Sequence, residues 1–108
     1  MKNYLLLLLL LAGACTSSKK NNLEEKNTVE NIELKAAKEK VPGITMEQLK
    51  HGSRLYIRNC SACHALHNPS QFTARQWQPI LVKMFEKSKI RDSATKALIT
   101  DYLLARSK

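Results

Sequence analysis

The chain has 108 residues, and its 18 lysines and arginines outnumber its 9 aspartates and glutamates, which gives a formal net charge of +9 at pH 7. This length leaves room for one small domain in which a hydrophobic core alone gives marginal stability, and only 6% of the residues are aromatic. A basic chain of this kind suits an acidic partner or nucleic acid. The motifs in the individual segments favour one of these two classes of partner over the other.

The N-terminal segment has the pattern of an export signal. Lys2 supplies a positive charge, residues 5–11 are all leucine, and three small residues at 12–14 precede Cys15. The leucine run is too short to span a bilayer. The segment resembles a bacterial lipoprotein signal, which implies a signal peptide over residues 1–14 and lipid modification of Cys15. Ordinary secretory cleavage that leaves Cys15 unmodified is the alternative.

Residues 15–44 form the next segment, and they are rich in lysine, glutamate and asparagine. Their charges nearly balance, and their scattered apolar residues make no sustained stripe. Because so little apolar surface is available to offset the entropy lost on ordering, we expect a flexible linker with transient helix over residues 30–40. Val41, Pro42 and Gly43 would then break the chain direction and mark the start of a domain over residues 45–108.

The domain is predicted to open with a helix that runs to about Asn59. Thr45 and Gln48 have the spacing of a capping box, in which each side chain bonds the backbone of the other residue. Gly52 and Tyr56 share one face of this helix. Since glycine weakens a helix interior, Gly52 suggests the close approach of another helix.

A second capping box predicts another helix in the middle of the domain. Thr73 and Gln76 form the box, but Pro79 follows, so the helix either begins nearer Gln78 or bends at the proline. Its apolar face carries Trp77, Leu81 and Met84. The last helix is predicted to be capped by Asp92 or Ser93 and to run towards Ala105, with an apolar stripe of Leu98, Tyr102 and Ala105 and with Ile99 and Leu103 alongside it.

A C-x-x-C-H motif occupies residues 60–64, directly after the first predicted helix. Thiols one helical turn apart can each add to a vinyl group of haem, and the following histidine then lies under the iron. Two alternatives stay open for Cys60 and Cys63. One is a zinc site completed by His51, His64 or His67, and the other is a redox dithiol, which the helical flanks disfavour.

The motif resembles that of the cytochrome c family. The resemblance implies an all-α fold of three to four helices around one covalently attached haem c. It implies that Cys60 and Cys63 hold the haem and that His64 is an axial iron ligand. It also implies that Gly52 and Tyr56 meet the C-terminal helix.

Met84 is the candidate for the second axial ligand. Small members of the family carry an axial methionine downstream of the motif, while Met1 would leave with the signal peptide and Met46 begins a helix expected to pack away from the iron. A thioether opposite His64 would raise the reduction potential and close the site to small molecules. The alternative is that Met84 is a core residue and the sixth position is open.

Further candidates for contacts near the haem are Pro69, His67, Trp77 and Arg75. A backbone carbonyl near Pro69 is the expected acceptor for the second ring nitrogen of His64. His67 lies too close to His64 in the sequence to reach the opposite face of the haem, so we expect a solvated loop residue. Trp77 is expected in the core and Arg75 in solvent, in preference to contacts with haem propionates.

Together these features predict a membrane-anchored, single-haem cytochrome that transfers electrons on the periplasmic side of the cell envelope and is not itself an enzyme. A haem-based gas binder becomes the better interpretation if Met84 does not bind iron, and a fixed haem subunit of a larger oxidoreductase is a further alternative. The basic surface predicts an acidic redox partner. Export argues against nucleic acid, and we expect a monomer.

Overall fold

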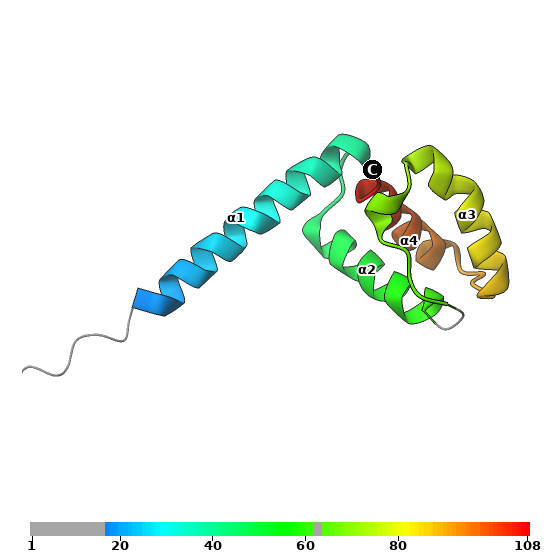
Figure 1. Cartoon of the computed structure of the whole chain (residues 1–108), viewed down its shortest axis with the longest axis horizontal. Coiled ribbons are helices and arrows are strands. Elements are labelled where there is room, and N and C mark those ends of the chain that lie inside the picture. The colour runs from blue at the N-terminus through cyan, green and yellow to red at the C-terminus, as the bar shows by residue number, and fades with distance from the viewer. Residues whose placement is uncertain (1–16, 62–63) are drawn as a thin grey trace, which may run out of the picture. The chain divides into compact units, whose positions relative to one another are not determined.

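Four α-helices and one short 3-10 helix make up the part of the chain that the computed structural model describes, residues 17–61 and 64–108, with side chains from Leu23 onward. These elements are α1 (Ser17–Lys40), α2 (Met46–Cys60), η1 (Pro69–Gln71), α3 (Ala74–Lys87) and α4 (Ser93–Ala105) (Figure 1). No strand occurs among these residues, so the predicted all-α fold is confirmed. The predicted signal peptide, Cys15 and Cys63 lie outside the described residues.

The chain divides into two units, of which the first ends at Asn31 and the second covers Ile32–Lys108. The boundary falls inside α1, so the second unit begins earlier than the expected domain start at residue 45. All described residues of the predicted haem site belong to this second unit. Among the helices of the described ranges, none has both the length and the apolar character needed to cross a membrane.

Part of the segment predicted as a flexible linker, residues 15–44, forms α1 from Ser17 to Lys40. Within the second unit, Ala37 and Ile44 are buried in one cluster with Leu49 and Ala105. The apolar residues at positions 34 and 37 lie near the end of α1, and those at positions 41 and 44 belong to the segment that connects α1 to α2. Packing of these residues with Leu49 and Ala105 offsets the entropy lost when the segment becomes ordered.

Polar contacts reinforce the packing of the end of α1. The Arg106 guanidinium donates to the Glu33 carboxylate at 3.1 Å, and the two side chains are 35% and 40% exposed. The Lys40 ammonium donates to the carbonyl oxygen of Ser107. The C-terminal end of α4 is therefore held by residues that precede the predicted domain.

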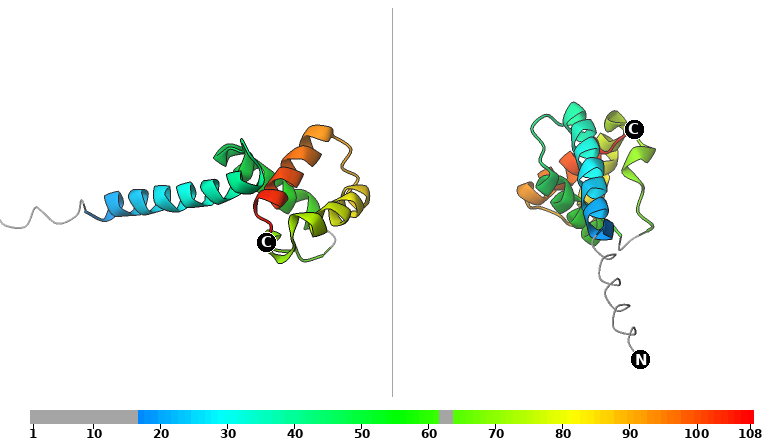
Figure 2. Two further views of the ribbon diagram at one scale, coloured as in Figure 1. Left: turned by 90° about the horizontal axis from the view of Figure 1, so that it is seen from above. Right: turned by 90° about the vertical axis from the view of Figure 1, so that its left-hand side faces the viewer.

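Helix α4 lies between α2 and α3, and its crossing with α2 is the tightest in the domain (Figures 1 and 2). A Cβ atom at Gly52 would lie 2.4 Å from the carbonyl oxygen of Leu98 and 2.6 Å from the Cβ of Tyr102. The rings of Tyr56 and Tyr102 also meet, with centroids 6.0 Å apart. The predicted role of Gly52 and Tyr56 at the helix crossing is confirmed.

The starts of α2 and α3 agree with the predicted capping boxes. Thr45 caps α2 and Thr73 caps α3, each with the reciprocal bond from the glutamine three residues later. Helix α3 begins at Ala74 in spite of Pro79, which lies inside it. Pro79 has no N–H to donate to the carbonyl oxygen of Arg75, and because both residues are exposed, water can bind that oxygen instead.

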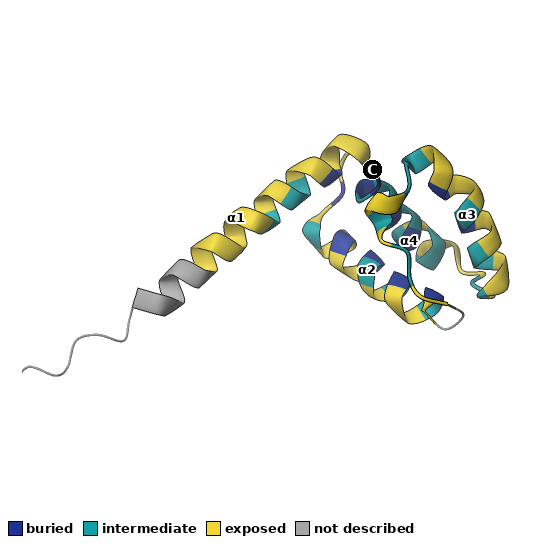
Figure 3. Ribbon diagram, in the orientation of Figure 1, coloured by how far each residue is buried: buried dark blue, intermediate teal, exposed yellow. Residues whose placement is uncertain are grey.

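The buried face of α4 differs slightly from the predicted stripe. Asp92 is the N-cap, as expected, and accepts a hydrogen bond from the backbone N–H of Thr95 at 2.8 Å. The fully buried residues are Ile99 and Leu103, whereas Tyr102 is only partly buried. The face is rotated by about one residue because α4 packs against α2 and α3 together (Figure 3).

The end of α3 adopts an uncommon backbone conformation. Lys89 has a φ of 58°, in the left-handed region that favours glycine. The N–H of Ile90 bonds the carbonyl oxygen of Phe85 and the N–H of Lys89 bonds that of Glu86, at 3.1 and 3.2 Å. These two bonds form a Schellman motif, which ends the helix with lysine in the place usually taken by glycine.

Candidate functional site

A pocket of about 360 Å3 lies between the C-terminal end of α2 and one face of α3. Its volume is within the range of small-molecule and cofactor sites. Three of the predicted site residues, Cys60, His64 and Met84, line this one pocket. The other lining residues are Asn59, Ile80, Lys83, Lys87 and Ser88.

Cys60 is placed by the last turn of α2. It is buried at 7% exposure and belongs to the main core cluster with Trp77 and Leu81. The preceding residue, Asn59, donates its side-chain amide to the carbonyl oxygen of Leu55 at 2.8 Å, which secures the helix end. The first cysteine of the motif is therefore held at the end of α2, where it is one of the residues that line the pocket.

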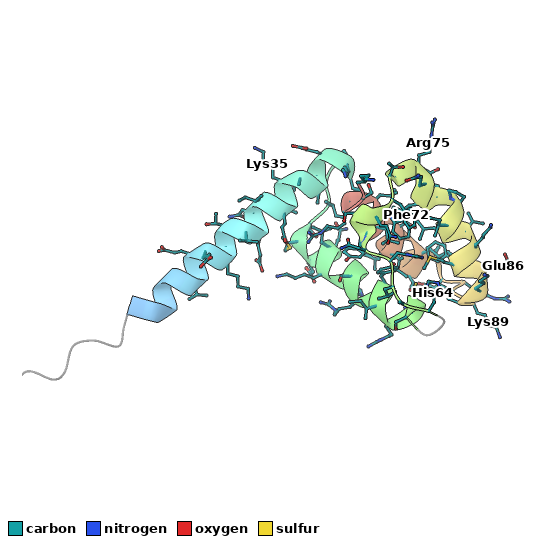
Figure 4. The ribbon with its side chains drawn as sticks, viewed as in Figure 1. Lys35, His64, Phe72, Arg75, Glu86 and Lys89 are labelled. Atoms are coloured by element: carbon teal, nitrogen blue, oxygen red, sulfur yellow. The ribbon has the colours of Figure 1, made fainter. Side chains whose placement is uncertain are left out.

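His64 is exposed beside the pocket, close to the end of α2 (Figure 4). Its Nδ1 lies 2.7 Å from the carbonyl oxygen of Ala65, so the expected bond to a carbonyl near Pro69 is not found. The Pro69 carbonyl oxygen instead accepts from the indole N–H of Trp77 at 2.8 Å. With Nδ1 engaged by Ala65, Nε2 is the ring nitrogen of His64 left for a metal.

Met84 is partly buried on α3 and is fixed by the residue that caps its helix. The backbone N–H of Ser88 bonds the carbonyl oxygen of Met84 at 2.9 Å, and the Ser88 hydroxyl donates to the same oxygen at 2.6 Å. Trp77 and Leu81, on the same face, are buried as predicted. Met84 lines the pocket from α3, while Cys60 lines it from α2.

A row of aromatic rings connects His64 to the core, a feature not predicted from the sequence. His64, His67, Phe72 and Trp77 follow one another with centroid separations of 5.4, 5.3 and 5.1 Å, and Trp77 meets Tyr56 at 6.3 Å. The predicted solvated loop residue His67 is thus half-buried within this row. The only sequence signal for the row was the aromatic content of residues 64–77, which does not define contacts.

Tyr56 ties the segment after the motif to α2. Its hydroxyl donates to the carbonyl oxygen of His67 at 2.8 Å. Burial raises the pKa of Tyr56 to about 12, and negative charge at Cys60 or Tyr102 contributes to the same rise. The neutral phenol that donates this bond is therefore the form present at physiological pH.

The charged groups that line the pocket are all cationic. Lys83 and Lys87 stand one turn apart on α3, and no carboxylate is among the lining residues. Trp77 and Arg75 do not line the pocket, and Arg75 is exposed and points outward in Figure 4. A thiol, an imidazole and a thioether around one pocket are the groups that attach and ligate haem, so the described residues fit this cofactor.

The zinc alternative gains no support from the described residues. Across residues 17–61 and 64–108, no three His, Cys, Asp or Glu side chains group as metal ligands would. A structural zinc site requires four such ligands around one point. Cys63, which the zinc alternative also needs, lies outside the described part.

Residues 56–108 match the family model described as dihaem cytochrome c. The matched segment is just under half of the chain and runs from Tyr56 to the end of α4 and beyond, so it includes the C-x-x-C-H motif and Met84. Neither the curated proteins nor the solved structures yield a match. This segment is therefore similar to dihaem cytochrome c over the motif and the helices that follow it.

Proposed function

We propose that this protein is a c-type cytochrome that carries single electrons between redox partners. The observation that supports the proposal most directly is that Cys60, His64 and Met84 line one pocket. Bound haem supplies reversible one-electron chemistry at its iron. The chain's own residues hold, orient and enclose that group.

Each site residue has a distinct role in this proposal. Cys60 and Cys63 attach the cofactor covalently, and His64 binds the iron through Nε2 while Ala65 holds its ring orientation. Met84 supplies the second axial ligand from α3, with its backbone fixed by Ser88. A filled sixth position keeps small molecules from the iron, which suits electron transfer better than gas binding.

The number of haems in the proposal is one per chain. The matching family is described as dihaem, which leaves the count open. The 108 residues contain one C-x-x-C-H motif, and each covalent haem of this type requires one such motif. A haem-to-protein ratio from absorbance and iron analysis measures the count directly.

We further propose that a lipid on Cys15 anchors the protein on the periplasmic side of the cell envelope and that its partner is acidic. The signal pattern before Cys15 and the net charge of +9 support these two parts of the proposal. Replacement of Cys15 with serine should release the protein from membranes. Unchanged membrane retention of this variant would contradict the anchor.

A pyridine haemochrome spectrum tests the central proposal. The purified protein, produced by export in a host that attaches haem c, should give the spectrum of a haem with two thioether bonds. The Cys60→Ser variant should give the spectrum of a haem with one thioether bond or carry no haem. A wild-type protein that contains zinc and no haem would overturn the proposal.

A further inference from the structure

The charge of the pocket between α2 and α3 favours an anionic ligand group. Lys83 and Lys87 both line it, and its other lining residues are neutral or, in the case of His64, weakly basic. Both lysines are exposed, so their ammonium groups reach water while their aliphatic stems border the pocket. Within the described residues, no acidic side chain lines the pocket to offset the two cations.

The spacing of these lysines matches a ligand with two neighbouring anionic groups. Residues four apart on a helix have Cβ atoms about 5–6 Å from each other, and two like charges at this spacing destabilise the helix slightly. No salt bridge to either lysine is found among the described residues. An anion pair at the pocket would remove this repulsion and form charge-assisted hydrogen bonds.

The covalent chemistry at Cys60 indicates which edge of the cofactor faces the lysines. The vinyl groups that react with the cysteines and the two propionates stand on opposite edges of the haem ring. Cys60 belongs to α2, on one side of the pocket, and Lys83 and Lys87 belong to α3, on the other. Attachment at α2 would therefore leave Lys83 and Lys87 of α3 as the residues available to bind the two carboxylates.

We infer that Lys83 and Lys87 bind the two haem propionates and thereby raise the reduction potential of the iron. This inference rests on the proposed function, because it requires haem at Cys60 and Cys63. The paired ammonium groups offset the propionate charges, which would otherwise favour the more positive, oxidised iron. Lys83 and Lys87 would therefore contact the cofactor directly, from positions on either side of the candidate ligand Met84 in the sequence.

The test is the reduction potential of the purified haem protein, measured without any partner. The double variant Lys83→Gln/Lys87→Gln should keep its haem and show a redox equilibrium shifted roughly tenfold towards the oxidised form, which is about 59 mV for one electron. The arginine pair Lys83→Arg/Lys87→Arg should keep the wild-type potential. Carboxylate bands in the redox-difference infrared spectrum should move in the glutamine variant and stay in place in the arginine variant.

Lys89→Gln is the matched control, because it removes the same charge from the same end of α3. Lys89 does not line this pocket but a second hollow beside Phe85 and Ile90. We expect a smaller change of the reduction potential for Lys89→Gln, and this change should disappear at a salt concentration of about 0.5 M. The change of the reduction potential in the double variant should persist at that salt concentration.

Two outcomes would overturn the inference while leaving the proposed function intact. One is a haem-containing double variant with the same potential as Lys89→Gln. The other is a double variant that changes only the rate of electron transfer to an acidic partner, which would assign the lysines to docking. A wild-type chain without haem would instead overturn the proposed function and this inference with it.

Discussion

The backbone of α2 at Gly52 and that of α4 at Leu98 touch, because a Cβ atom at residue 52 would come within 2.4 Å of the Leu98 carbonyl oxygen. Backbone cannot move aside as a flexible side chain can. The contact therefore fixes the distance between the two helices, and α2 carries Cys60 at its end. The position of Cys60, the proposed first site of haem attachment, depends on this crossing.

The Gly52→Ala substitution should lower the free energy of unfolding by about 2 kcal/mol. Overpacking typically costs about 1–3 kcal/mol, and the better helix propensity of alanine returns up to about 1 kcal/mol. Because the clash is with backbone, we expect an overpacking cost at the upper end of the range of about 1–3 kcal/mol, about 3 kcal/mol before the gain in helix propensity is subtracted. Urea denaturation measures it, with Ser53→Ala on the same helix as the control for propensity. A Gly52→Ala variant as stable as Ser53→Ala would show that α4 can shift freely.

Tyr56 should make stability fall at alkaline pH. Its pKa is 10.0 for the unperturbed group and about 12 in the fold, so the neutral phenol is favoured by folding. The contribution is fully present below pH 10 and is lost as pH rises from about 10 to about 12, and it amounts to roughly 2–3 kcal/mol. The unfolding free energy of wild type should start above that of Tyr56→Phe, fall over this window and end below it, because phenylalanine has no group that titrates.

The same variant gives a second readout at neutral pH. Tyr56→Phe removes the bond to the His67 carbonyl oxygen and should cost about 0.5–1.5 kcal/mol. A difference between the two proteins that does not change between about pH 9 and about pH 12 would contradict the raised pKa. Part of the rise in the pKa of Tyr56 comes from a thiolate at Cys60, and thioether formation removes that charge. The pH range over which wild type loses stability should therefore be narrower in the haem-loaded protein.

Met84→Ala should open the sixth coordination position while leaving the haem attached. Carbon monoxide should then bind the ferrous protein readily, and the reduction potential should fall because the thioether favours reduced iron. Met84→Leu keeps the side-chain volume without the sulfur, and it should show the same changes with less loss of stability. If Met84 only packs the core, Met84→Leu will resemble wild type, and Met84→Ala will lose up to about 2–5 kcal/mol with unchanged ligation.

Lys89→Gly should stabilise the protein by about 0.5–1 kcal/mol, because the left-handed conformation at a φ of 58° costs a residue with a Cβ atom about 1–2 kcal/mol. The greater freedom of glycine in the unfolded chain cancels part of this gain. The denaturant midpoint should rise for Lys89→Gly and remain near wild type for Lys89→Ala, which keeps the Cβ atom. Equal midpoints for both variants would exclude relief of backbone strain.

Features set by neighbouring residues were predictable from the sequence. The capping boxes at Thr45 and Thr73 depend on bonds within one helical turn, so the residue types alone indicate them. The close crossing at Gly52 was also predictable, because glycine weakens a helix interior and is favoured on an apolar face where a neighbouring helix leaves no room for a Cβ atom. The C-x-x-C-H motif is likewise visible in the sequence, because its residues lie within five positions of one another.

Features that depend on distant residues were not predictable. The ordering of α1 near Ala37 depends on Leu49 and Ala105, and alanine carries too little apolar surface to mark a helical face by itself. The Nδ1 partner of His64 was misassigned because Trp77, eight residues beyond Pro69, already uses that carbonyl oxygen. Which donor reaches a given carbonyl oxygen depends on the tertiary structure and cannot be inferred from the spacing of residues in the sequence.

Trp77 is the single tryptophan of the chain, and it is fully buried in the cluster that contains Cys60. Its fluorescence therefore comes from one known position beside the pocket. An iron porphyrin within the same small domain absorbs the light that an indole emits and quenches it by energy transfer. The emission of Trp77 should be bright in chains that never received haem, dark in the mature protein, and restored when denaturant separates the two. The fluorescence of Trp77 should therefore report whether a given chain has received haem.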